Sequence, residues 1–300
     1  MRRCQLKPYK KQRGVMIIAA VLVAISIAIT FSTLFIKRND QAYNDFYQSD
    51  ESRSILMSEI KSQIQKYYIA NSNDLSKNDL PNNISKENIL NQLSIPKNSS
   101  AKINIGITNI KSNDKFQWRD IYAWIPATDG FDESVFNPSG NQKNNFIPGD
   151  GVSWTAFSGQ PVEAQNFSQA SDQIEYVAGV IRSMYASRVG SDPLRDQSAN
   201  YFADCGPRPT YARNIHTLSC SGSGDIVSLD SLGASESIGL SNNDFINPWG
   251  KNIQASNTTG TINLNNESHT ISSNETPYNM ILTSQTPTGY VIFRYIIQPL

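Results

Sequence analysis

The sequence predicts an α+β fold: a long N-terminal helix, first transmembrane and then amphipathic, packed on an antiparallel β-sheet and followed by a β-rich C-terminal region. Three observations predict it. Residues 15–36 form an apolar run without a charge, the helical spacing of apolar residues continues to Asn71, and strand-like segments begin at Lys102. The composition agrees, because a charged fraction of only 17% suits β-rich folds outside the cytoplasm better than helical cytosolic enzymes.

Positive charge is concentrated at the N-terminus, although the formal net charge of the chain is zero. Six basic side chains and no acidic one lie within residues 1–14: Arg2, Arg3, Lys7, Lys10, Lys11 and Arg13. Of the 26 basic side chains, 20 remain beyond this leader against 26 acidic ones, a net charge of about −6. A nucleic-acid-binding protein is expected to carry the opposite sign, so we predict no nucleic-acid partner.

The apolar run at residues 15–36 predicts a retained membrane helix. As a helix it would be about 33 Å long, which matches the hydrocarbon thickness of a bilayer. A cleaved secretory signal has a shorter apolar region and ends in a small-x-small site, whereas this run ends in Ile36, Lys37 and Arg38. The basic leader then stays in the cytoplasm, and the chain beyond Lys37 is exported.

The residues after the membrane helix predict that it continues without a break. From Lys37 to Asn71 there is neither proline nor glycine, and a turn-forming cluster begins only at Asn71. The apolar residues with helical spacing are Ala42, Phe46, Ile55, Leu56, Ile60, Ile64, Tyr67 and Tyr68. The whole helix, residues 15–71, would be roughly 84 Å long. An ordinary anchored enzyme usually has a flexible linker at this place.

The combination of a basic leader, Arg13-Gly14, and an apolar helix that runs into an amphipathic one resembles the type IV prepilin family and its type II secretion pseudopilin relatives. In that family a membrane peptidase cleaves after the glycine and methylates the new N-terminus. The resemblance implies cleavage between Gly14 and Val15. It also implies three kinds of partner: other pilin subunits, the prepilin peptidase and an inner-membrane assembly platform.

The resemblance also implies a location and an assembly role. The subunit is stored in the bacterial inner membrane with a periplasmic C-terminal part, and it reaches a pilus or the cell surface after assembly. The apolar helix, with Ala19, Phe31 and Phe35, would then pack in the core of the filament. Membrane contact is therefore expected before assembly.

Ala19 departs from the family pattern. Most members carry a glutamate at this place, five positions into the mature chain, and it is thought to pair with the N-terminal amine of a neighbouring subunit. A charge in hydrocarbon is costly unless paired, and no acidic residue occurs from Val15 to Ile36. The tip pseudopilins of the family share this absence, which favours a minor pilin, with the tip as one position for it. The alternative is a plain signal anchor in which Gly14 is a coincidence.

The cysteine count predicts one disulfide. Cys4 lies in the leader, and its removal leaves Cys205 and Cys220. An even number in an exported chain favours a Cys205–Cys220 bond, which would stabilise the fold by roughly 3 kcal/mol. The alternative is a pair of free buried thiols.

The first exported region, residues 72–150, reads as a pilin-like α+β module. Ser85–Leu93 predicts a short helix capped by Ser85. Lys102–Ile110 and Phe116–Ile125 alternate between apolar and polar residues and predict a β-hairpin with one buried face. Residues 129–161 are rich in Gly, Pro, Asn and Asp and are expected to be a linker or exposed loops.

Residues 151–300 read as a second α+β module that contains the disulfide. A helix is predicted over Val162–Arg188, ending near Gly190, with one apolar stripe: Phe167, Ile174, Val177, Ala178, Ile181, Met184 and Tyr185. This second part could equally complete one large sheet with the first.

The C-terminal part of this module predicts a turn and several strands. Asn247–Gly250 resembles a turn that recurs in pilins, and Trp249 is expected to pack on the sheet. Strands are predicted near residues 261–265, 269–273, 278–285 and 290–298. The last is strongly apolar and is expected to be a central strand.

No catalytic motif is present in the sequence, and we predict no enzymatic activity, cofactor or metal. His216 and His269 are isolated and are expected to be bystanders. Asp129, Asp132 and Glu133 are the one grouping that could contribute to a calcium site, although a solvated loop is favoured. The function predicted is assembly as a minor pilin or pseudopilin. The alternative is a signal-anchored envelope protein with a periplasmic binding or adhesin domain that does not assemble.

Overall fold

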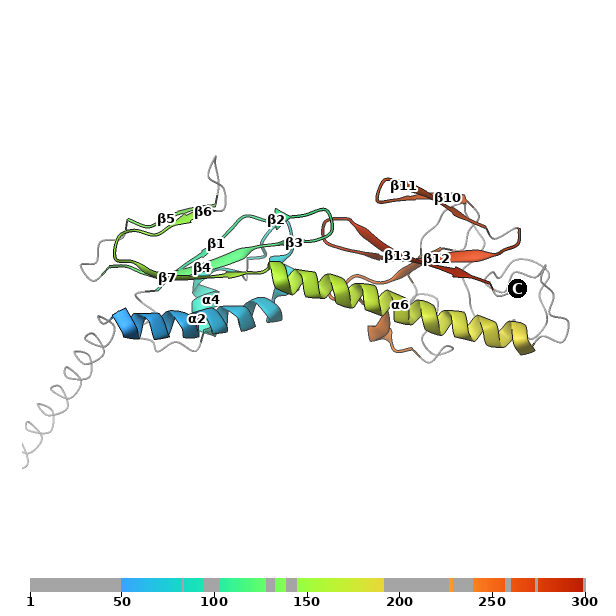
Figure 1. Ribbon diagram of the computed structural model, residues 1–300, viewed down its shortest axis with the longest axis horizontal. Helices are drawn as coiled ribbons and strands as arrows, with labels where there is room; N and C mark the ends of the chain where they lie inside the picture. The colour runs from blue at the N-terminus through green and yellow to red at the C-terminus, as the bar shows by residue number, and fades with distance from the viewer. Residues whose placement is uncertain are drawn as a thin grey trace, which may run out of the picture. The chain divides into compact units, whose positions relative to one another are not determined.

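The computed structural model describes residues 50–82, 84–93, 103–127, 133–138, 145–191, 227–228, 240–256, 260–272 and 275–298 (Figure 1). These ranges contain helices and antiparallel sheets, which confirms the α+β class. The predicted membrane helix at residues 15–36 lies outside them. Within the described ranges, no helix combines the length and the apolar character needed to cross a bilayer.

The helices of the described residues are α2 (Asp50–Ala70), α3 (Ser72–Leu75), α4 (Lys86–Gln92), α6 (Gln160–Ser191) and the short 3-10 helix η3 (Asn242–Phe245). The strands of the first part are β1 (Asn104–Ile107), β2 (Lys111–Ser112), β3 (Gln117–Trp118), β4 (Asp120–Ile125), β5 (Val135–Asn137), β6 (Asn145–Ile147) and β7 (Ser153–Ser158). Those of the second part are β8 (Val227–Ser228), β9 (Gln254–Ser256), β10 (Gly260–Leu264), β11 (Glu267–Ile271), β12 (Asn279–Gln285) and β13 (Val291–Ile297). By its contacts the chain divides into two compact units, Met1–Ser58 and Glu59–Leu300.

Helix α2 ends where the sequence predicts. At its end, the side-chain amide of Asn71 donates a 2.9 Å hydrogen bond to the carbonyl of Tyr67, which also accepts from the backbone N–H of Asn71 at 3.1 Å. The predicted stripe of Leu56, Ile60, Ile64, Tyr67 and Tyr68 is buried. Ile55 is 60% exposed, against the prediction. Positions 56, 60 and 64 follow one helix face, and residue 55 is turned about 100° away from it.

The predicted hairpin between residues 102 and 125 is present. β1 pairs antiparallel with β4, and β2 continues the pairing with β3. Helix α4 packs against β1. It begins as predicted, because the Ser85 hydroxyl accepts a hydrogen bond from the backbone N–H of Asn88.

The expectation of a linker or loops at residues 129–161 is wrong for three segments. β5 and β6 form a hairpin, and β7 pairs along the whole of β4 to complete the three-stranded sheet β1-β4-β7. β7 reads Ser-Trp-Thr-Ala-Phe-Ser, with only half-buried or exposed residues. The sequence of β7 therefore lacks the clear alternation of buried apolar and exposed polar residues that predicts a strand. The backbone hydrogen bonds with β4 make it a strand.

The second sheet has the strand order β13-β12-β9-β8 within the described residues. The predicted strands near 261–265, 269–273, 278–285 and 290–298 are present as β10 to β13. The expectation that the last is central is wrong for the sheet that the structure describes, where β13 pairs with β12 alone and lies at the edge. Its apolar sequence reflects cover on both faces: Ile292 and Ile296 join the core beneath α6, and Phe293 and Tyr295 pack with the β10–β11 hairpin.

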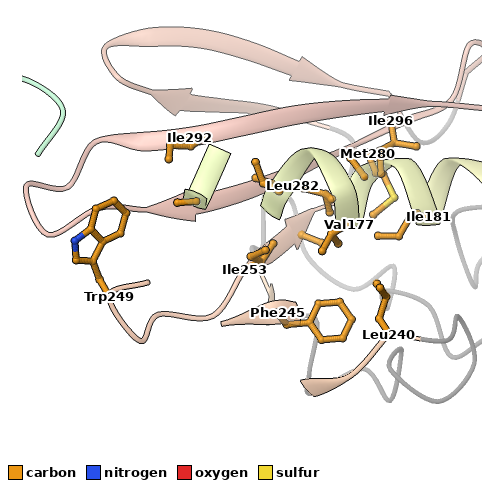
Figure 2. Packing of buried hydrophobic residues seen from close by; sticks show 14 of the residues in the cluster. Val177, Ile181, Leu240, Phe245, Trp249, Ile253, Met280, Leu282, Ile292 and Ile296 are labelled. Carbon is orange, nitrogen blue, oxygen red and sulfur yellow. The ribbon is translucent and has the colours of Figure 1, made fainter. Parts of the chain in front are cut away.

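Helix α6 runs along β12 and β13, as Figure 1 shows. It is longer than the predicted Val162–Arg188. Of its predicted stripe, Ile174, Val177, Ala178 and Ile181 are buried and Phe167 packs at their margin; the side chains of Met184 and Tyr185 lie outside the description. Figure 2 shows Val177 and Ile181 against Met280, Leu282 and Ile296, with Phe245 and Ile253 closing the core from the other side.

Candidate functional site

The site residues that the sequence singles out lie outside the described residues: Gly14, Val15, Ala19, Phe31, Phe35, Cys205 and Cys220. Processing after Gly14, packing of the assembly helix and the disulfide therefore remain predictions. Asp129, Asp132 and His216 are also outside the described ranges, so the calcium alternative is not decided. Where side chains are described, no three His, Cys, Asp or Glu residues lie together in a way that could hold a metal ion.

His269 lies on β11 among aromatic rings. Its Nδ1 is 3.1 Å from the Tyr295 hydroxyl, and its ring centroid is 4.5 Å from that of Phe293. These contacts pack the imidazole against Phe293 and Tyr295 of β13, and the bystander role stays a prediction.

The most unusual polar arrangement in the described residues joins Tyr68, Glu163 and Trp249, which we call the carboxyl cluster. Glu163 is fully buried, at 0% exposure. Its Oε2 accepts a 2.8 Å hydrogen bond from the indole N–H of Trp249 and a 3.2 Å bond from the side-chain amide of Asn166. Its Oε1 has no well-formed hydrogen bond in the described part of the chain. A carboxyl in such a place is expensive to ionise.

The start of α6 positions Glu163. The residue lies in the first turn, and its backbone N–H donates to the carbonyl of Gly159 at 3.0 Å. Gly159 in turn donates its N–H to the carbonyl of Arg119 at 3.0 Å, which ties the helix start to the strands. A Cβ at position 159 would lie 2.0 Å from Cζ of Tyr68, so only glycine lets the phenol ring approach this closely.

The Asn247–Gly250 turn positions Trp249. The side-chain oxygen of Asn247 accepts from the backbone N–H groups of Trp249 at 3.1 Å and Lys251 at 2.9 Å. Its amide donates to Ser284 Oγ at 3.1 Å and to the carbonyl of Gln285 at 3.0 Å, which fixes the turn to β12. Gly250 has φ of 74° and closes the turn in a conformation that favours glycine. The turn and the packing of Trp249, which is 4% exposed, agree with the sequence prediction.

Tyr68 brings α2 into the cluster. Its hydroxyl oxygen accepts a hydrogen bond from the backbone N–H of Arg119 at 3.3 Å, and its ring lies 5.6 Å from that of Phe157. The Arg119 guanidinium donates to the carbonyls of Thr108, Lys77 and Asn78 rather than to a carboxylate. The cluster therefore connects α2, the β3–β4 connection, α6 and the Asn247–Gly250 turn.

Burial dominates the electrostatics of the cluster. It raises the pKa of Glu163 from 4.5 to about 7, although hydrogen bonds from Trp249, Asn166 and Tyr68 oppose the rise. The pKa of Tyr68 is raised far above its ordinary value, first by burial and then by the neighbouring Glu163. Near neutral pH the site can therefore gain or lose one proton at Glu163, while Tyr68 stays neutral. Because the carboxyl is fully buried, this arrangement suits a structural or switching role better than catalysis.

A second feature is a group of five aromatic rings on the face of the first sheet that points away from Tyr68. We call it the aromatic face, and its residues are Tyr122, Trp124, Phe136, Phe146 and Trp154. The rings of the β5–β6 hairpin cover Tyr122 and Trp124, and a Cβ at Gly106 would meet the Phe136 ring at 2.9 Å. Trp154 is 47% exposed at the edge strand β7.

The sequence reasoning missed both features. A signal for Glu163 was present, because counting back along the α6 stripe from Ile174 through Ala170 and Phe167 reaches position 163 at helical spacing. The buried face of the helix therefore includes the carboxylate. The contacts of Tyr68 and Trp249 with it depend on long-range packing and have no local sequence signal.

No family model, no curated protein and no solved structure matches this chain.

Proposed function

We propose that this protein is a minor pilin or pseudopilin, which is stored in the bacterial inner membrane and assembled into a type IV pilus or pseudopilus. The observation that carries the proposal is the N-terminal sequence: six basic residues, Gly14, an uncharged apolar run over residues 15–36, and helical spacing that continues beyond it. Cleavage after Gly14 would leave Val15 as the first residue of an assembly helix. The function is then assembly rather than catalysis.

The order of elements in the exported part supports the proposal. α2 and the short helices α3 and α4 precede the antiparallel sheet β1-β4-β7, which gives the helix-then-strands order expected of a pilin. Tyr68, near the end of α2, packs on the sheet through Phe157. If the assembly helix continues into α2 as we propose, Tyr68 joins the end of that helix to the sheet.

Intact mass tests the proposal directly. The chain is produced in otherwise identical cells with and without a prepilin peptidase, and its N-terminus is identified by mass spectrometry. We expect a mature form that begins at methylated Val15 only where the peptidase is present. Gly14→Val should block this processing, and Gln12→Ala, two residues away in the leader, serves as the matched control. A chain that keeps residues 1–14 in both strains would overturn the proposal.

A second candidate function is a signal-anchored envelope protein with a periplasmic binding or adhesin domain that never assembles. Exposed apolar residues near the first sheet favour it: Trp154 of the aromatic face is open to solvent, and so is the cross-strand pair Val135 and Ile147 of the β5–β6 hairpin. Fractionation separates the two candidates. A subunit that assembles appears in the sheared filament fraction together with other pilins, whereas an anchored protein stays with the inner membrane.

A further inference from the structure

We propose that the carboxyl cluster is a proton-sensitive latch: protonated Glu163 holds α2, α6 and the Asn247–Gly250 turn together, and ionised Glu163 loosens their junction. The proposal does not depend on the proposed function. It rests on the position of one carboxyl at the meeting point of segments that are far apart in the sequence.

The three segments of this junction meet at one side chain, that of Glu163. Glu163 and Trp249 are 86 positions apart, and their 2.8 Å hydrogen bond joins the start of α6 to the turn before β9. Tyr68 reaches the same place from α2, with its ring against Gly159. Trp249, at the edge of the core in Figure 2, also packs with the residues beneath α6. A change at Glu163 therefore acts on all three segments at once.

No cation in the described residues neutralises the Glu163 carboxylate. On the β3–β4 connection, Arg119 donates to backbone carbonyls, and Asp120 is paired with Lys111 at 2.6 Å. On the turn, Lys251 donates to Gln285 and Thr286. From α2 comes the neutral phenol of Tyr68, and from α6 the neutral amide of Asn166. An ionised Glu163 would thus be a buried charge without an ion-pair partner, which proteins tolerate poorly.

The competing effect is the strength of the hydrogen bonds. An ionised carboxylate is a better acceptor than a neutral carboxyl, so the bonds from Trp249 and Asn166 favour the charged form. Burial outweighs them, because the pKa of Glu163 is raised to about 7 after these bonds are taken into account. Protonation therefore stabilises the closed junction, and the change falls in the neutral range.

The latch can be observed at the Trp249 indole. The chain has four tryptophans, so the full-length protein in detergent micelles, labelled with 15N-tryptophan, gives few indole signals. Trp249→Phe identifies the Trp249 signal by its loss. We expect this signal to shift between pH 5.5 and 8.5 with a midpoint near 7. At pH 5.5, the protection of this indole against hydrogen exchange should equal that in Glu163→Gln. At pH 8.5, it should be at least about tenfold lower than in that variant.

Two variants give the controls. Glu163→Gln keeps the shape and a hydrogen-bond acceptor without the charge, so its Trp249 signal should stay in the closed position throughout. Asp172→Asn removes an exposed carboxylate from the same helix and should titrate like the parent protein. The exchange of backbone amides at 247–251 should follow the indole, whereas the β10–β11 hairpin should not respond.

Three results would overturn the proposal. A midpoint below pH 5.5 would mean that the carboxyl stays ionised in the closed junction. A transition that survives in Glu163→Gln would assign the proton to another group. A normal titration with unchanged exchange protection would mean that Glu163 binds a proton without any opening.

Discussion

The indole N–H of Trp249 lies 2.8 Å from Oε2 of Glu163, and both side chains are buried. This hydrogen bond connects the turn before β9 with the first turn of α6. It explains why a carboxylate occupies the apolar stripe of that helix: the carboxyl is the acceptor that a buried indole needs. The burial of this carboxyl, which the hydrogen bond only partly offsets, makes the stability of the protein depend on pH.

We predict that the stability of the protein falls as the pH rises from about 4.5 to about 7. In this range folded Glu163 keeps a proton that the unfolded chain has released, since its pKa is about 7 in the fold against an ordinary 4.5. The contribution of this group decreases by up to about 3 kcal/mol across the window and stays constant above it. Thermal unfolding at pH 4.5 and 8.5 measures the difference. Glu163→Gln should reduce the pH dependence, and an equally steep dependence in that variant would contradict the assignment.

Gly159→Ala should destabilise the fold by about 1–3 kcal/mol, because the new methyl group would overlap the Tyr68 ring. Denaturant unfolding monitored by circular dichroism gives the value. Gly179→Ala is the matched control, since a methyl group at that position of α6 would meet no atom beyond its own stretch of helix within 4 Å. It should stabilise the helix by about 0.5–1 kcal/mol. Equal effects of the two substitutions would refute the close approach of Tyr68.

Asn247→Ala should cost about 2–4 kcal/mol, since the side chain makes four hydrogen bonds that hold the turn to β12 and orient Trp249. The Trp249 indole signal should broaden or shift as the turn loosens. Asn243→Ala, at an exposed position of η3, should change the free energy of unfolding by less than about 0.5 kcal/mol. A neutral Asn247→Ala would show that other contacts fix the turn.

The predicted Cys205–Cys220 bond should appear as a mass difference between reduced and non-reduced protein after thiol alkylation. Replacing both cysteines by serine should lower the free energy of unfolding by roughly 3 kcal/mol if the bond closes a loop in the folded chain. Two alkylated thiols without reductant would show that the cysteines are free.

Ala19→Glu tests the place of the subunit in a filament. For a subunit at the tip, no further subunit lies beyond Ala19, so the new carboxylate gains no partner and incorporation should change little. The amount of the protein in sheared filaments, measured by immunoblotting, reports this. A clear rise in shaft incorporation would argue against the tip, and Ala20→Ser provides a neighbouring control for substitution in the apolar helix.

The sequence by itself determined the elements whose signals are local. The end of α2 at Ala70 follows from the Asn71 cluster, α4 follows from the Ser85 cap, and the hairpin between residues 102 and 125 follows from alternating residues with a turn between them. The Asn247–Gly250 turn is local in the same sense, because proline, glycine and an Asn side chain fix it within four residues.

Only the tertiary structure decided the features that depend on distant partners. β7 is a strand because β4 lies beside it, and β13 is apolar at a sheet edge because α6 and the β10–β11 hairpin cover its two faces. The meeting of Tyr68, Glu163 and Trp249 has the same cause. Local sequence indicates that each of these residues is buried or turned inward. The pKa of a buried carboxyl, however, depends on the groups that the fold brings within hydrogen-bonding distance of it.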